Sequence, residues 1–272
     1  MKKAFLWVIA VIAVVSLVSC DGFFSSSWGN PREYKASNIK ITTNNLDTIK
    51  KTAVGNPEYA RAAGEKITNT IKNESNDANK AKYMDAAVEL AWIGSELDTF
   101  ILGQAGGMAD LLLDDELEGD DNIANEFVNS LRPLIKSKNF QKTVENLAES
   151  AVECLKPGTA GSMPTFIDDY TPTAADVDKA VLTLLAGVLG DDLDNFDDLM
   201  SGEGDWDDIK DLTQGLNVSD TDPKKIVVEN ASKTTDAGLA LAAYLNYIAD
   251  NKTQMEGSLI AGTIFDMISG TE

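Results

Sequence analysis

Residues 78–102 have the sequence ANKAKYMDAAVELAWIGSELDTFIL, which is the strongest helical pattern of the chain. Apolar side chains return every three or four residues along this stretch, at Met84, Ala87, Val88, Ala91, Trp92, Leu97 and Ile101. Leu90 and Ile93 widen the apolar stripe. The spacing predicts one helix over 78–102 that ends at Gly103, and the width of the stripe predicts burial against more than one neighbour.

Further helical patterns lie on both sides of this stretch. Asn56-Pro57-Glu58 has the residue types of a helix start, namely a capping amide, a proline at the first helical position and an early acid. Apolar residues at helical spacing predict additional helices in 57–72, 108–117, 123–135, 138–156, 173–188, 224–250 and 253–268. Residues 38–43 alternate apolar and polar side chains like a short strand, and other strand signals are nearly absent. The expected fold class is all-α, either a multi-helix bundle or a short, irregular α-solenoid of about 8–10 helices.

The sequence holds one partial repeat signal and one candidate domain boundary. The pair 57–72 and 78–102 resembles a tetratricopeptide pair in its small and aromatic residues. The full tetratricopeptide pattern does not return at a spacing of about 34 residues, so this resemblance covers at most one or two helix pairs. The Pro- and Gly-rich stretch 157–172 is either one ordered loop or the boundary between two subdomains.

The composition excludes several kinds of chemistry. The chain has 272 residues, with 23 basic residues, 44 acidic residues, no histidine and two cysteines. Without histidine there is no Ser-His-Asp or Cys-His catalysis and no His-ligated metal, and two cysteines cannot form a four-thiolate site or a disulfide framework. A net charge of −21 argues against a nucleic-acid partner, because phosphate contacts need Lys and Arg. We therefore expect no cofactor and no enzymatic activity.

The first 20 residues, MKKAFLWVIAVIAVVSLVSC, have the pattern of an exported leader. Lys2 and Lys3 precede an apolar run over 4–15, which is shorter than the roughly 20 residues of a stable transmembrane helix. Leu17-Val18-Ser19-Cys20 resembles the lipobox of bacterial lipoproteins. The alternatives are a plain signal peptide with an unrelated cysteine and an uncleaved anchor.

The lipobox resemblance implies that residues 1–19 are a signal peptide, removed before Cys20. Cys20 then carries a diacylglyceryl thioether and an acylated amino group, and fatty acyl chains such as palmitate anchor the protein in a membrane. The expected location is the periplasmic face or the outer surface of a bacterial cell. Residues 20–43 are expected to form the lipidated cysteine and a flexible tether, and residues 44–272 the helical domain.

Cleavage before Cys20 leaves 21 basic and 44 acidic residues, a net charge of −23 that anionic headgroups repel. Three aromatic residues of the tether, Phe23, Phe24 and Trp28, either rest in the membrane interface or pack on the domain.

One stretch of the helical part resembles the acidic, all-helical, uncharacterised lipoproteins of spirochaetes. It is Asp85-Ala86-Ala87-Val88-Glu89-Leu90-Ala91, together with the small-residue break and the Leu/Ile-rich continuation that follow it. That resemblance carries no functional residues across.

Acidic clusters are the conspicuous polar feature of the chain. The nearest approach to a calcium loop begins at Asp114 and offers Asp114, Glu116, Glu118 and Asp120 as oxygen ligands. The twelfth position holds Asn125, and the acid Glu126 comes one residue late. We therefore expect no metal site there, and expect the acids to solvate loops and to complement helix dipoles.

Three other features of the sequence are candidates for a chemical or packing role. Asp168-Asp169-Tyr170 is the best candidate for paired catalytic carboxylates, and the alternative is a turn. Cys154 lies on an apolar helical face, where a small buried side chain is expected and an intermolecular disulfide is the alternative. Trp92 is expected in the core, whereas Trp206, which acids flank, is expected to be a partly exposed anchor.

These patterns leave three hypotheses for the function. The first is a membrane-anchored, non-enzymatic interaction or scaffold module that presents an acidic surface to a protein partner in the cell envelope. The second is a periplasmic solute- or lipid-binding component with an apolar pocket between helices. The third is a carboxylate-dependent hydrolase, which would need two acids facing each other about 5–9.5 Å apart.

Overall fold

The computed structural model describes residues 34–101, 130–158, 161–191, 216–219, 225–230, 233–255 and 257–258. The named helices are η2 (Ala36–Asn38, a 3₁₀ turn), α2 (Leu46–Ala53), α3 (Pro57–Lys72), α4 (Asp77–Ser95), α7 (Lys138–Val152), α8 (Ala174–Asp191) and α11 (Asp236–Asp250). Residues 97–101 and 130–135 are also α-helical. Two three-residue strands, β1 (Leu216–Val218) and β2 (Ile226–Val228), pair in antiparallel fashion. The described residues are mostly helical, which confirms the all-α prediction.

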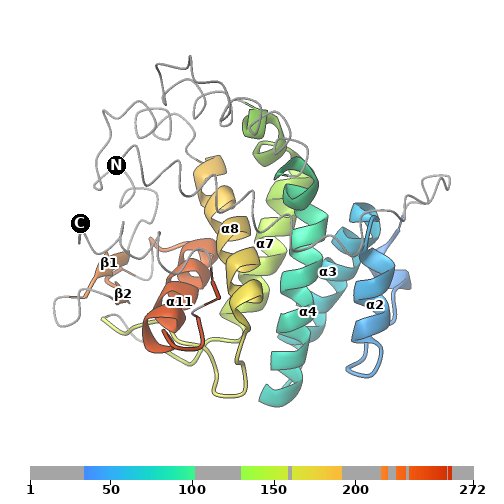
Figure 1. Cartoon of the computed structure of the whole chain (residues 1–272). Coiled ribbons are helices and arrows are strands. Elements are labelled where there is room, and N and C mark those ends of the chain that lie inside the picture. The colour runs from blue at the N-terminus through green and yellow to red at the C-terminus, as the bar shows by residue number, and fades with distance from the viewer. Residues whose placement is uncertain are drawn as a thin grey trace.

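The helices form a bundle rather than a solenoid. Figure 1 shows them running across the molecule from α2 to α11. Helix α4 packs against α2, α3, α7 and α8, and α7 packs against α3, α4, α8 and α11. In a solenoid each unit contacts only its neighbours in the chain, whereas here α3 meets α7 and α4 meets α8. Of the two architectures that the sequence predicts, the structure therefore has the bundle.

Helix α4 lies at the centre of this bundle. Every residue from Ala86 to Ser95 is buried except Glu89, which is half-buried. Met84 and Leu90 have no exposed surface, and Trp92 lies in the same core. The prediction that this helix is buried against more than one neighbour is confirmed, and so is the prediction that Trp92 is a core residue.

Two predicted helix starts are confirmed at atomic detail. The Asn56 side chain accepts a hydrogen bond from the backbone N–H of Tyr59 at 3.1 Å, and Pro57 is the first residue of α3. At the start of α8, the Thr173 hydroxyl accepts from the Asp176 N–H at 3.3 Å and donates to the Asp176 carboxylate at 2.6 Å. Each cap satisfies a backbone donor that the helix itself leaves unpaired.

Two helices end earlier than the sequence predicts. The helix predicted over 78–102 breaks at Glu96, which adopts the left-handed conformation with φ of 62°. The helix predicted over 138–156 ends at Val152, because Leu155 pairs with Phe166 in an isolated β-bridge. Backbone hydrogen bonds of this bridge, such as Lys156 N–H to Thr165 O at 2.8 Å, replace the helical ones.

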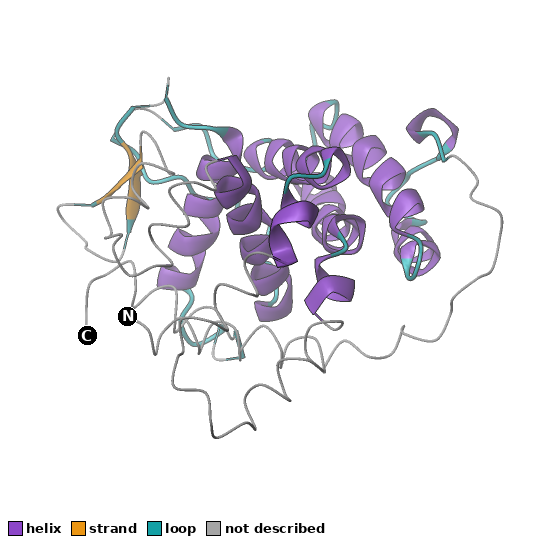
Figure 2. Ribbon diagram, turned by 90° about the horizontal axis from the view of Figure 1, so that it is seen from above, coloured by secondary structure: helices purple, strands orange, loops and turns teal. Residues whose placement is uncertain are grey.

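The prediction of a helix over 224–250 is wrong in its first part, since residues 226–228 form strand β2 and α11 begins at Asp236. Three consecutive β-branched residues favour the extended conformation there. Buried Asn246 of α11 holds the strand: its side-chain oxygen accepts from Ile226 N–H at 2.8 Å, and its amide donates to Ile226 O at 2.9 Å and to Pro164 O at 3.1 Å. Figure 2 shows the hairpin at the edge of the bundle.

Two stretches that the sequence assigns to connections pack on the bundle. Residues 38–43 are not a strand; the 3₁₀ turn η2 ends at Asn38, and Ile39 is buried in the main core. Within 157–172, Phe166 and Tyr170 are buried in the same core cluster, which continues from α7 into α8 and α11. The predicted helices 108–117 and 253–268 lie wholly or mostly outside the described residues. Among the described helices, none is both long enough and apolar enough to cross a membrane.

Close packing between α7 and α8 depends on a glycine. A Cβ atom added at Gly187 of α8 would lie 2.3 Å from a methyl carbon of Val144 on α7, which is far inside van der Waals contact. Gly187 therefore lets α7 and α8 approach more closely than a residue with a side chain would allow. Gly64 of α3 is a contrast, because an added Cβ atom there would meet nothing within 4 Å.

These two glycines give a matched pair of substitutions with opposite signs. We expect Gly187→Ala to lower the free energy of unfolding by about 1–3 kcal/mol, because the new methyl group overpacks the core. We expect Gly64→Ala to raise it by up to about 1 kcal/mol, because alanine loses less backbone entropy in a helix. Urea unfolding of both variants checks this, and a stabilised Gly187→Ala protein would contradict the packing of α8 on α7.

Candidate functional site

The described surface carries an open groove at the N-terminal end of the bundle, with a volume of about 380 Å³. Its lining combines aromatic, basic and apolar side chains from η2, α2 and α3, which are Tyr34, Lys35, Asn38, Ile39, Lys40, Ile49 and Tyr59. We call these residues the N-terminal groove. It lies where residue 34, the first described residue, leads into the bundle.

Two tyrosine rings are fixed at one wall of the N-terminal groove. The rings of Tyr34 and Tyr59 meet edge to face, with centroids 5.2 Å apart and an interplanar angle of 84°. The amide of Asn56 donates to the Tyr34 hydroxyl at 3.2 Å, while its oxygen caps α3. One side chain therefore positions both the start of α3 and the tyrosine that precedes the bundle. Burial raises the pKa of Tyr59.

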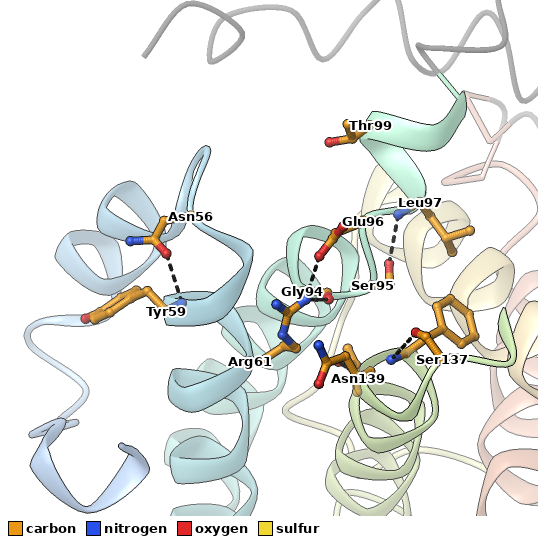
Figure 3. A network of polar contacts seen from close by, with 12 residues as sticks. Asn56, Tyr59, Arg61, Gly94, Ser95, Glu96, Leu97, Thr99, Ser137 and Asn139 are labelled. Carbon is orange, nitrogen blue, oxygen red and sulfur yellow. Dashed lines mark hydrogen bonds and ion pairs between the residues drawn. The ribbon is translucent and has the colours of Figure 1, made fainter. Parts of the chain in front are cut away.

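A second polar network surrounds the break after α4 (Figure 3). Arg61 of α3 donates to the backbone oxygen of Gly94 at 3.0 Å and to the Glu96 carboxylate at 2.8 Å. The Ser95 hydroxyl donates to Trp92 O at 2.8 Å and accepts from the N–H of Leu97 at 3.3 Å. These bonds satisfy the backbone groups that the break releases, so the network stabilises the chain reversal.

Gly94 allows Arg61 to come this close. A Cβ atom at Gly94 would lie 3.1 Å from Cγ of Arg61 and 3.5 Å from a methyl carbon of Thr143. The helices α3, α4 and α7 also enclose a space of about 10 Å³, roughly the volume that one water molecule needs. Beside it the buried Thr68 and Ser150 hydroxyls lie 3.0 Å apart, and Thr68 bonds backbone oxygens of α3 and α7. The arrangement is that of a packed, hydrogen-bonded helix interface.

The candidate carboxylate pair of the sequence is not brought together as a catalytic site. Asp168 is exposed and forms an ion pair with Lys156 at 2.6 Å, and Asp169 is exposed in the same turn. Tyr170 is buried, with its hydroxyl 2.9 Å from that of Tyr244. The alternative of a turn is therefore correct for Asp168-Asp169-Tyr170. Within the described ranges no three His, Cys, Asp or Glu side chains lie close enough to hold a metal ion.

Asp85, which is not among the candidate site residues that the sequence predicts, has a raised pKa. The pKa of Asp85 on α4 is raised to about 6, mainly by desolvation and in smaller part by the nearby charge of Asp176 on α8, while Lys50 on α2 opposes the shift. The sequence does not single out Asp85 for this property, because only the fold brings these helices together. Asp85 remains exposed to solvent as a residue, so the effect on stability is small.

Cys154 has the role that the sequence predicts. It has no exposed surface, and burial raises the pKa of its thiol to about 12. A protonated, enclosed thiol is a poor nucleophile, so Cys154 is a packing residue. The other site residues of the sequence analysis lie outside the described residues; they are Cys20, Phe23, Phe24, Trp28, Asp114, Glu116, Glu118, Asp120 and Trp206.

Comparison of the chain with protein-family models, with curated proteins and with solved structures finds no match. The resemblances to lipoproteins and to tetratricopeptide helices therefore stay predictions from the sequence.

The left-handed conformation at Glu96 can be tested with two substitutions that both remove the carboxylate. We expect Glu96→Gly to be more stable than Glu96→Ala by about 1 kcal/mol, because glycine adopts a positive φ without the strain that a Cβ atom brings. Urea unfolding at neutral pH measures the difference. Equal stability of the two variants would mean that the helix does not break at this residue in the way described.

The raised pKa of Asp85 predicts a pH-dependent stability. Between about pH 4 and pH 6 the folded chain binds a proton at Asp85 that the unfolded chain has released, so this residue makes stability fall as pH rises through that range. We expect Asp85→Asn to raise Tm at pH 7.5 and to leave it nearly unchanged at pH 4. Asp169→Asn, at an exposed turn, is the control. A Tm gain for Asp85→Asn that is equal at both pH values would contradict the assignment.

Proposed function

We propose that this protein is a lipid-anchored, non-enzymatic interaction module of a bacterial cell envelope, held in its membrane through Cys20. The observation that carries the proposal is the tetrapeptide Leu17-Val18-Ser19-Cys20 behind a basic start and a short apolar run. A thioether-linked diacylglycerol together with an amide-linked chain gives the two or more acyl chains that stable anchoring needs.

The described part of the fold supports a binding role rather than a chemical one. Its polar clusters are structural: the Arg61 network closes a helix break, and Thr68 with Ser150 joins α3 to α7. Glu89 and Lys179 likewise join α4 to α8 through a half-buried ion pair. A bundle that is packed in this way offers its surface for recognition, and the chain as a whole carries 44 acidic against 23 basic residues.

A solute-binding protein would need a larger enclosed cavity between its helices than the described structure shows. Pockets for small molecules have volumes of about 300–1,000 Å³ and enclose most of the ligand. The space between α3, α4 and α7 has about 10 Å³, and the larger N-terminal groove is open to solvent. These dimensions favour the interaction module over a solute carrier.

The two cysteines of the chain provide a matched test of the anchor. We expect the wild type and Cys154→Ala to incorporate a fatty-acid label and to partition into detergent, because Cys154 is a buried packing residue. We expect Cys20→Ala to lose the label entirely and to leave the detergent phase. Metabolic labelling and detergent partition of the three proteins measure this.

Either of two results would contradict the anchor. In the first, Cys20→Ala still carries the label. In the second, mass spectrometry of the wild type finds residues 1–19 still attached and an unmodified thiol at Cys20.

A further inference from the structure

The charge of the chain is divided unevenly along its length. Residues 34–82 carry nine basic and five acidic side chains, a net charge of +4. Residues 83–272 carry 11 basic and 37 acidic side chains, a net charge of −26. The first of these segments comprises η2, α2, α3 and the start of α4, and η2 and α2 lie at one side of the bundle in Figure 1. The N-terminal groove therefore belongs to the basic part of an otherwise acidic chain.

The N-terminal groove also combines exposed lysines with exposed apolar surface. Lys35 and Lys40 are exposed and form no ion pair with the described residues. Tyr34 and Val54, each 37% exposed, are the large apolar side chains that the described surface leaves open. Val54 ends α2 two residues before Asn56, whose amide binds the Tyr34 hydroxyl. The two exposed apolar side chains thus lie at the same corner of the bundle.

From this combination we infer that the N-terminal groove is a contact surface for anionic phospholipid headgroups, so that the anchored domain rests on its own membrane by this end. The inference depends on the proposed lipid anchor. Lysine ammonium groups attract headgroup phosphates, and tyrosine places an apolar ring and a polar hydroxyl at the boundary between lipid and water. Both residue types line the N-terminal groove, and the Tyr34–Tyr59 contact fixes the two tyrosine rings relative to each other.

Because the proposed lipid on Cys20 already holds the protein at the membrane, a weak contact between the groove and the headgroups is enough to orient the domain. Tyr34 follows Cys20 by 14 positions, and a chain of that length spans at most about 50 Å. An anchor this close keeps the groove at a high local concentration near headgroups, so the contact does not have to hold the protein by itself. Anionic lipid repels the acidic remainder of the chain over a Debye length of about 8–10 Å, which favours the orientation with the basic end toward the membrane.

The test uses the acylated protein reconstituted into vesicles. Cys154 is buried and Cys20 is acylated in the proposal, so a cysteine introduced at exposed Ser37 of η2 is the one thiol that a fluorophore labels. Vesicles contain phosphatidylcholine alone or mixed with phosphatidylglycerol, and each carries a headgroup nitroxide lipid as the quencher. A label at exposed Thr171→Cys, which does not line the groove, serves as the reference.

We expect the Ser37 label to be quenched in the anionic vesicles, and quenched much less in phosphatidylcholine or at high salt. The Thr171 label stays unquenched in both. The Lys35→Glu/Lys40→Glu variant reduces the fraction in contact by about tenfold or more, since each lysine contributes about fivefold near an anionic surface. The Lys138→Glu/Lys233→Glu variant makes the same charge change at exposed positions outside the groove and keeps the quenching.

The outcomes distinguish a failure of this inference from a failure of the proposed lipid anchor. If the protein floats with the vesicles but the Ser37 label is equally exposed with and without phosphatidylglycerol, the groove does not bind headgroups and the anchor stands. Equal loss of quenching in the two double variants also overturns the inference, because net charge and not the groove would then control the contact. If the protein fails to float with either kind of vesicle, the anchor and the inference both fail.

Discussion

The burial of α4 is the constraint on which the rest of the bundle depends. From Ala86 to Ser95 this helix has one residue that is not fully buried, so neighbouring helices must cover it on all sides. Helices α2, α3, α7 and α8 do so, although they come from segments far apart in the chain. Small residues such as Ala87, Ala91 and Gly94 let these neighbours approach closely, and Gly187 does the same where α8 meets α7.

The polar groups of a helix that is surrounded in this way need hydrogen-bond or ion-pair partners within the protein. Glu89, at the half-buried position, pairs with Lys179 of α8. At the end of α4 the chain reverses at once, and Arg61 and Ser95 satisfy the backbone atoms that the reversal exposes. The polar clusters of the described core thus follow from its packing, and the contact surface that we propose, the N-terminal groove, lies on the outside of the bundle.

The sequence predicts the elements whose signals are local. The apolar stripe of 78–102 and the caps at Asn56 and Thr173 depend on spacing and on hydrogen bonds within one turn, and the structure has them. The break at Glu96 and strand β2 were missed, because they depend on partners distant in sequence, Arg61 in one case and Asn246 in the other. For the same reason the sequence missed the N-terminal groove: its residues come from three elements that only the fold brings together.

Hydrogen exchange followed by mass spectrometry tests the central place of α4 most directly. If α4 is the core on which the other helices pack, its amides between Ala81 and Ile93 exchange only when the whole bundle unfolds, with the free energy of global unfolding. Amides of α2, which covers one side, exchange sooner. Exchange of α4 at a lower free energy than α7 or α11 would show that the bundle persists without it, and would contradict this account.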